Sequence, residues 1–234
     1  MDQDIVIKLF QFAILLFALS LHEASHAWMA SRLGDQTARM LGRVTLNPVK
    51  HIDPVGTILI PLAMLFMPGF GRFLIGWAKP TPVNTRNFKN LRRDDILTTL
   101  AGPSSNFLAA LVCAICLLIL ETTKAGKLSV VFAVFTANHV PVPPDVASPA
   151  MFPIALLLYL GFIVNLLLAI FNLLPLPPLD GSHIFRHMLP YNALRIYDSL
   201  GIISLILILF VGGRVVGIFL TPAVNALNSV LLRF

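Results

Sequence analysis

Residues 5–31 read IVIKLFQFAILLFALSLHEASHAWMAS, and this stretch decides the fold. A hydrocarbon layer about 30 Å thick is crossed by about 20 helical residues. The stretch is long enough to cross it, and it is apolar except for Lys8, Gln11 and a polar cluster near its end. The sequence therefore predicts a membrane-spanning helix that carries its polar side chains close to one surface of the bilayer.

The composition of the whole chain points to lipid as its solvent. Of the 234 residues, 57% are hydrophobic and 12% are charged, whereas an average soluble domain has about 45–50% and about 25%. These values argue against a soluble globular domain and against disorder. The net charge of +6 comes from Lys and Arg scattered between apolar runs. That pattern is typical of loops that orient a membrane protein, and it does not indicate nucleic-acid binding.

Further apolar segments follow the first. The hydropathy pattern predicts membrane segments at 96–120, 149–174, 197–213 and, as a membrane or interfacial segment, 215–232. The short segment 55–71 is also apolar, but prolines and glycines interrupt it. We therefore expect an all-α polytopic membrane protein of about five to six membrane segments, forming a single domain over residues 1–234.

Residues 55–71 are predicted to enter the membrane and return on the same side. Strongly basic loops at 32–53 and 72–93 flank the segment. Because basic loops favour the cytoplasm, a full crossing would put one of them on the wrong side. Irregular backbone is tolerated at membrane depth where protein or a wet cavity covers it. We also expect a short strand at 43–47, on the cytoplasmic side.

The polar cluster of the first helix has the pattern H-E-x-x-H. His22 and His26 are four residues apart, so both imidazoles lie on one helix face and can reach one metal ion. Zinc is the usual partner of this motif, with Glu23 as general base. In an apolar helix ionisable groups are costly and usually functional. A polar patch that only faces other helices remains the alternative.

Asp180 is the strongest candidate for a third ligand, which a catalytic zinc site normally needs. It follows a stretch with three prolines, NLLPLPPLD, and Gly181 then permits a sharp turn. On spacing alone, capping a helix over 181–189 explains Asp180 nearly as well. If 55–71 returns to its own side, the chain crosses twice more before Asp180, which then lies on the side where His26 emerges. This topology places the N-terminus outside and the site toward the cytoplasm.

The motifs HEASH, NPVKHIDPVGT, GWAKPTPVN, AGPSSN and NLLPLPPLDG together resemble the site-2 protease family of intramembrane zinc metalloproteases. The likeness is to compact members without PDZ or CBS domains. It implies that His22, His26 and Asp180 bind one Zn²⁺ per chain and that Glu23 acts as general base and acid. It also implies that Asn172 contacts substrate or stabilises the oxyanion.

Two more residues are candidates for binding substrate or the oxyanion. Asn106 matches the asparagine of the family's AGPxxN motif. His51 precedes Asp53 at the mouth of the segment 55–71, where it could donate to a residue of the metal site, stabilise the oxyanion or serve as a turn histidine that the backbone satisfies. The strand expected at 43–47 could pair with an unwound substrate.

The function expected from these motifs is hydrolysis of peptide bonds within membrane segments near the cytoplasmic side. The expected substrate is a single-pass or signal-peptide-like transmembrane protein, the surroundings are membrane lipid, and the location is a prokaryotic cytoplasmic membrane. A metal transporter or sensor would need polar residues along a whole path, and an inactive scaffold predicts a damaged motif. The sequence does not fix the oligomeric state.

Overall fold

The computed structural model describes residues 3–66, 76–140, 149–200, 203–204, 207–208 and 212–233. These residues form helices and connecting loops without a strand. In chain order, the elements are α1 (Gln3–Arg32), α2 (Thr37–Met40), η1 (Pro48–Lys50), η2 (Pro54–Leu59), α3 (Ile60–Phe66), η3 (Thr85–Asn87), α4 (Leu91–Glu121), α5 (Lys124–Ala137), α6 (Phe152–Asn172), α7 (Asp180–Arg186), α8 (Tyr191–Asp198) and α10 (Gly213–Leu231).

Four of the described helices, α1, α4, α6 and α10, are long and apolar enough to cross a membrane. They cover the segments predicted at 5–31, 96–120, 149–174 and 215–232. The prediction of an all-α polytopic membrane protein is therefore confirmed. Of the segment predicted at 197–213, residues 201–202, 205–206 and 209–211 lie outside the described residues, and this prediction stays untested.

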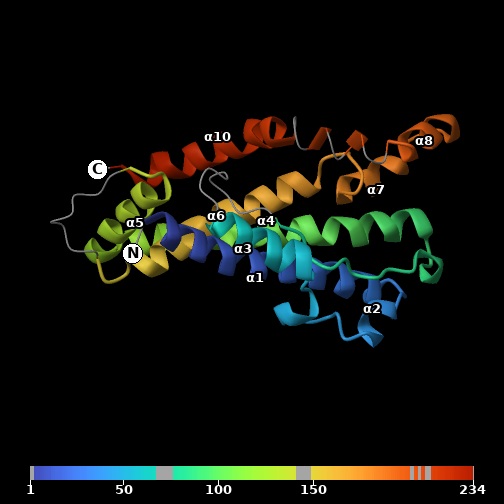
Figure 1. Ribbon diagram of the computed structural model, residues 1–234, viewed down its shortest axis with the longest axis horizontal. Helices are drawn as coiled ribbons and strands as arrows, with labels where there is room; N and C mark the ends of the chain where they lie inside the picture. Colours follow the sequence, from blue (N-terminus) through green and yellow to red (C-terminus); the bar gives the residue numbers. More distant parts are fainter. Residues whose placement is uncertain are drawn as a thin grey trace.

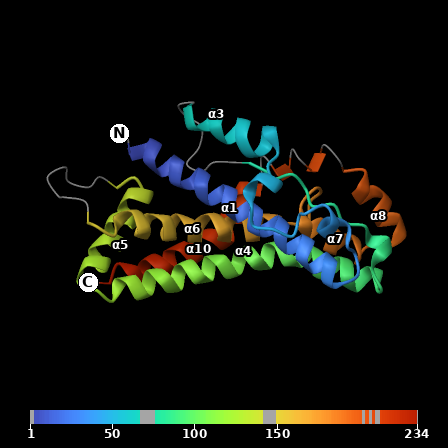
Figure 2. The ribbon, with the colours of Figure 1, turned by 90° about the horizontal axis from the view of Figure 1, so that it is seen from below.

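Helices α1, α4 and α6 pack against one another at the centre of the molecule (Figures 1 and 2). Ala18, Ala110 and Ala155 are almost completely buried between them. Such small side chains let helices approach closely in lipid, where apolar side chains gain nothing by leaving the solvent. On α4, Val112 and Ile119 are 58% and 63% exposed, as expected of a face that contacts lipid.

The long axis of the molecule has two distinct ends (Figure 1). The N-terminus, α5 and the C-terminus lie at one end, which we call the α5 end, and α2, α7 and α8 lie at the other, which we call the α7 end. Helix α1 finishes at the α7 end, α4 runs away from it, and α6 returns to it. This connectivity brings the end of α6, and with it Asp180, back to the end where α1 finishes.

The two flanks of the predicted re-entrant segment lie beside each other. The backbone N–H of Trp77 donates to the carbonyl of Gly56 over 3.2 Å, and the hydroxyl of Thr57 donates to the carbonyl of Trp77 over 2.7 Å. At the far end of α3, the ammonium of Lys8 donates to the carbonyl of Met64 over 3.2 Å. The described flanks of the segment thus lie at one level, as re-entry requires. Residues 67–75 lie outside the described part, and re-entry into the bilayer stays a prediction.

The strand expected at 43–47 is not formed, because the polar groups there have other partners. The guanidinium of Arg43 donates to the carbonyls of Lys79 and Pro80. The side chain of Asn47 accepts from the N–H of Val49 over 3.1 Å and begins the turn η1. The bond at Asn47 is local and competes with a strand ladder, and the segment is an irregular loop.

The connection between α4 and α6 contains a further helix, α5, which the sequence did not predict. The hydroxyl of Thr123 accepts from the N–H of Gly126 over 3.0 Å and caps α5 at its start. Val130 and Ala133 on α5 are completely buried. Burial of this apolar face against α6 explains the helix, because a helix of this length is marginal by itself.

Candidate metal centre

Three potential ligand atoms converge at the α7 end of the bundle. Nε2 of His22 lies 3.0 Å from Nε2 of His26 and 3.0 Å from Oδ2 of Asp180, and the distance from His26 Nε2 to the same oxygen is 3.4 Å. Within the described residues, this is the group of His, Cys, Asp and Glu side chains that could hold a metal ion. Both histidines are buried. The structure therefore brings together the three ligands predicted from the sequence.

The other nitrogen of each imidazole contacts an acceptor. Nδ1 of His22 donates to the side-chain oxygen of Asn106 over 2.6 Å, and Nδ1 of His26 donates to the carbonyl of Thr98 over 2.7 Å. Neither oxygen can donate in return, so these bonds assign the proton of each neutral imidazole to Nδ1.

This assignment leaves a lone pair on both Nε2 atoms, and these lone pairs face each other and a carboxylate. Such an arrangement is repulsive unless a cation lies between the donors. Two imidazole nitrogens and one carboxylate oxygen are ligands that zinc prefers, and three protein ligands leave a position for water. The donor set therefore fits a catalytic zinc ion.

Asn106 contacts His22 at Nδ1, the ring nitrogen that faces away from the cluster, and is itself completely buried. Its amide nitrogen donates to the carbonyl of Ala18 over 3.1 Å and to the side-chain oxygen of Asn165 over 2.9 Å. These two acceptors orient the amide so that its oxygen points at His22. The polar atoms of Asn106 thus all have partners inside the bundle, and its contact with substrate or the oxyanion stays a prediction. Asn165 was not predicted from the sequence, where it looks like one polar residue in an apolar helix.

Asp180 is the first residue of α7 and does not cap that helix with its side chain. The backbone of Leu179, the residue before it, is extended, with φ −74° and ψ 156°. The proline-rich turn thus places the carboxylate of Asp180 beside His22. A Cβ on Gly181 would lie 2.3 Å from the carbonyl oxygen of Leu173, so only glycine fits at this turn. Of the two interpretations of Asp180, the geometry favours the ligand.

Glycine is also required on the helix that faces the histidines. A Cβ on Gly102 would lie 2.3 Å from Nε2 of His26 and 2.7 Å from Cε1 of His22. Helix α4 can therefore approach the two rings only because residue 102 has no side chain. This contact gives a physical reason for the glycine of the AGPSSN motif.

Glu23 lies beside the cluster and is held by the loop that contains GWAKPTPVN. The backbone N–H of Thr81 donates to Oε2 of Glu23 over 2.7 Å, and the hydroxyl of Thr81 donates to the carbonyl of Glu23 over 3.0 Å. Glu23 is half-buried. Its other oxygen, Oε1, is left for a proton-transfer partner.

Two predicted site residues are not joined to the cluster by any bond in the described structure. The amide nitrogen of Asn172 donates to the carbonyl of Leu168 in its own helix over 3.0 Å. His51 is buried, and its Nε2 donates to the carbonyl of Thr45 over 2.8 Å. Through this bond His51 contacts the loop around it, and a role toward the oxyanion stays a prediction.

A further contact attaches α7 to α4. Nε2 of His187, directly after α7, lies 2.7 Å from Oδ2 of Asp95 in the first turns of α4, and both side chains are largely buried. The pair holds the helix that carries Asp180 against the helix that covers the histidines. Sequence spacing gave no signal for this long-range pair.

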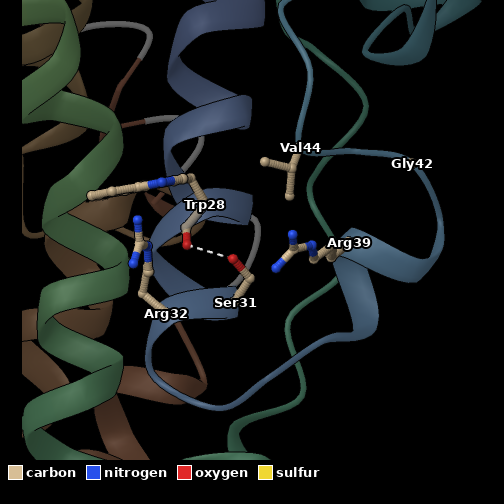
Figure 3. Close-up of a pocket in the computed structure, with 6 residues that line it drawn as sticks. All are labelled: Trp28, Ser31, Arg32, Arg39, Gly42 and Val44. Carbon is tan, nitrogen blue, oxygen red and sulfur yellow. Dashed lines mark hydrogen bonds between the residues drawn. The ribbon is translucent and has the colours of Figure 1, made fainter.

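Figure 3 shows a cavity of about 440 Å³ beyond the cluster, between the last turns of α1 and the turn after α2. Its lining consists of Trp28, Ser31, Arg32, Arg39, Gly42 and Val44. The guanidinium of Arg32 lies 5.4 Å from the centre of the Trp28 ring, a cation–π distance. The lining offers two cations but no carboxylate or imidazole, so this cavity does not suit a metal ion.

Comparison with known proteins agrees with a zinc site at this position. Residues 10–211 match the profile of peptidase family M50. A Bacillus subtilis protein named "Putative zinc metalloprotease YwhC" is 39% identical over 176 residues, which cover 75% of this chain and 67% of that protein. Proteins named "Putative zinc metalloprotease Rip2" from Mycolicibacterium smegmatis and Mycobacterium tuberculosis are 30% and 31% identical over 166 residues, 71% of this chain and 52% of each relative. No solved structure matches the chain significantly.

The chain thus spans about two thirds of the Bacillus protein and about half of the mycobacterial proteins that it matches. The matched region includes the histidines of α1 and the aspartate of α7. The relatives' printed names specify zinc, which is the metal that the donor set fits best.

We expect Asn106→Leu to weaken zinc binding about 10- to 100-fold, because the change removes the acceptor that fixes the tautomer and orientation of His22. Competition between the purified protein and a chelator of known affinity measures this change. Ser105→Ala is the matched control, since the Ser105 hydroxyl donates only to the carbonyl of Gly102 in its own helix. Wild-type zinc affinity in Asn106→Leu would show that Asn106 does not support the ligand.

Proposed function

The chain belongs to peptidase family M50, the site-2 protease family, and on that premise we propose that it hydrolyses peptide bonds in transmembrane segments near the cytoplasmic side of the bilayer. Membership of this family, together with its similar relatives, identifies the chain as a metalloprotease. Its apolar helices identify it as an integral membrane protein, and its bacterial relatives agree with a location in the bacterial cytoplasmic membrane. The observation that carries the proposal is the convergence of His22, His26 and Asp180 on one point.

These three side chains would hold one zinc ion per chain. Two neutral imidazoles and one carboxylate leave a net charge of about +1 on a loaded site, which suits an oxyanion. When bound there, zinc would supply Lewis acidity, which makes water a nucleophile near neutral pH and polarises a carbonyl. The bonds from His22 to Asn106 and from His26 to Thr98 keep both rings in the tautomer that can bind it.

Glu23 would move the proton. Because the Thr81 N–H occupies Oε2, the proton of the attacking water would go to Oε1 and from there to the leaving amine. Asn172 stays a candidate for contacting substrate. It is half-buried at the end of α6, and its amide would have to leave the Leu168 carbonyl to reach a substrate oxygen.

The proposed substrate is a single-pass or signal-peptide-like transmembrane protein, with lipid around the exposed apolar faces of the enzyme. Carbonyls inside a substrate helix are already hydrogen-bonded, so a scissile bond becomes accessible only where the helix unwinds. A substrate segment weakened by Gly, Pro or Asn near the cleavage depth would therefore suit the enzyme.

The site is proposed to face the cytoplasm. Basic residues gather at the α7 end, where Arg32 and Arg39 line the cavity of Figure 3 and Arg92 and Arg93 begin α4. Lys and Arg are enriched in cytoplasmic loops, which supports this orientation.

We expect Glu23→Gln to lower cleavage of a defined single-pass substrate in detergent by about 100- to 10,000-fold, because a proton acceptor is lost. Zinc content should stay at the wild-type value, since Glu23 is not among the three ligands. Glu121→Gln, at the end of α4, changes the chain's other glutamate and should cleave normally. Unchanged cleavage by Glu23→Gln would refute Glu23 as the base.

We expect removal of helix breakers from the substrate to slow cleavage. Replacing Gly or Pro near the scissile bond by Leu raises the free energy of local unwinding by about 1 kcal/mol or more per residue, and replacing Asn raises it by less. That change corresponds to at least about a fivefold lower rate, which mass spectrometry of the cleavage products can follow. Equal rates for both substrates would mean that local unwinding does not limit the reaction.

We expect opposite accessibility for cysteines placed at the two ends of the molecule, in a background where Cys113 and Cys116 are Ala. Met40→Cys lies at the α7 end, where Met40 is 79% exposed, and Lys124→Cys begins α5 at the other end. A membrane-impermeant maleimide should label only position 124 in intact cells and position 40 in inside-out vesicles. The reverse labelling would invert the proposed orientation.

A further inference from the structure

Residues 78–87, which we call the strap, cross over α1 at the level of Glu23. The strap enters from Trp77 and ends in the turn η3. At its middle, the N–H of Thr81 donates to Oε2 of Glu23 over 2.7 Å. The hydroxyl of Thr81 also donates to the backbone carbonyl of Glu23 over 3.0 Å. One strap residue thus contacts both the side chain and the main chain of Glu23.

The sequence of the strap leaves one donor for this contact. Thr81 stands between Pro80 and Pro82, and proline has no N–H. The N–H of Thr81 is therefore the only backbone donor in the tripeptide, and it points at the carboxylate. The two prolines also fix their own φ angles, which limits the movement of this donor.

A buried arginine anchors the strap just before Thr81. Nη2 of Arg43 donates to the carbonyl of Lys79 over 2.8 Å and to the carbonyl of Pro80 over 2.9 Å. Arg43 is 6% exposed, and it has no acidic partner among the described ion pairs. The N–H of Lys79 donates in turn to the carbonyl of His51 over 2.9 Å. Because the described bonds of this buried charge go to main-chain carbonyls, we infer that Arg43 fixes the path of the strap.

A buried aspartate anchors the strap after Thr81. Asp35, directly beyond α1, is completely buried and accepts from the N–H of Asn84 over 2.7 Å and from the amide of Asn87 over 2.8 Å. Burial alone would raise the pKa of Asp35, but the hydrogen bonds from Thr37, Asn87 and Asn84 outweigh it and hold that pKa below its ordinary value.

The turn at Gly34 permits this anchor. Its φ is +117°, and a Cβ there would lie 2.9 Å from the carbonyl oxygen of Asn87. Glycine is thus needed both for the backbone conformation and for the close approach of the strap. The strap is fixed to the α1 side of the molecule on both sides of the Glu23 contact.

We propose that the strap positions the carboxylate of Glu23 for proton transfer through the N–H of Thr81, with Arg43 and Asp35 as positioning residues that act through the strap. The inference rests on the proposed function, since it concerns the group that moves the proton. Holding Oε2 limits the rotamers of Glu23 and leaves Oε1 as the oxygen that would take the proton. The effect expected is on the chemical step and not on substrate binding or on the metal.

The first test is a comparison of variants at Arg43 in the detergent cleavage assay. Arg43→Met should lower kcat about 10- to 100-fold, because a displacement of about 1 Å of a reacting group can cost about 100-fold in rate. KM and zinc content should remain within about twofold of wild type if the effect acts only through the base. Arg43→Lys should recover part of kcat, since its ammonium can still donate to one of the two carbonyls.

Arg86→Met is the matched control, because Arg86 belongs to the strap, is exposed and makes no side-chain bond in the described structure. It should keep the wild-type kcat. A wild-type kcat in Arg43→Met, or a fall that comes with loss of zinc or a matching rise in KM, would overturn the proposal. A comparison of the cleavage rates of wild type and Glu23→Gln in the same assay tests the proposed function separately.

The second test does not depend on activity. A peptide covering residues 78–83 has exchangeable amides only at Lys79, Thr81 and Val83, since Ala78 becomes its free amino terminus and Pro80 and Pro82 have no N–H. One amide of this peptide should exchange about tenfold faster in Glu23→Ala than in wild type, because a net hydrogen bond of about 1.4 kcal/mol is lost. Glu23→Gln, which keeps an acceptor oxygen, should stay close to wild type. Equal exchange in Glu23→Ala and wild type would overturn the contact itself.

Discussion

The structure depends on one contact, the meeting of two imidazoles and a carboxylate inside an apolar bundle. Unpaired polar groups are costly there, so each must be satisfied by a partner or by an ion. His22 and His26 use one ring nitrogen each for a protein acceptor and turn the other toward Asp180. This requirement fixes the relative positions of α1, α4 and α7 more tightly than apolar packing could, because lipid competes for apolar surface.

The same requirement explains why the central helices are in one register. Asn106 links α4 to α1 through the carbonyl of Ala18 and to α6 through Asn165, whose own amide donates to Gly161 over 2.9 Å. Three helices are thus joined by one chain of hydrogen bonds that ends at His22. A shift of any helix by one turn would leave several of these buried groups without partners, at a cost of about 1–3 kcal/mol each. Metal ligation and helix packing are therefore parts of the same constraint.

The sequence predicted those features whose cause is local. The spacing of His22 and His26, the long apolar runs and the proline-rich turn before Asp180 follow from helix geometry and backbone chemistry, and the structure agrees with them. It could not predict partners that are distant in the chain. Nothing near Asn165 indicates Asn106, and nothing near Arg43 indicates two carbonyls more than thirty residues away, so Arg43 was placed in a strand. The helix α5 was missed because its support comes from α6.

Irregular backbone between α1 and α4 has no regular ladder of hydrogen bonds, so its buried N–H and C=O groups need partners from side chains. Two buried charged side chains, Arg43 and Asp35, provide these partners, and they do not form an ion pair with each other in the described structure. Arg43 donates to two main-chain carbonyls of the strap, and Asp35 accepts from the main-chain N–H of Asn84 and from the side-chain amide of Asn87, so each charge meets groups of the opposite polarity. An ion pair between them would have neutralised both and left the strap without anchors. The few charges of this chain therefore do more than orient it, since they make a non-helical segment rigid enough to hold a reacting side chain.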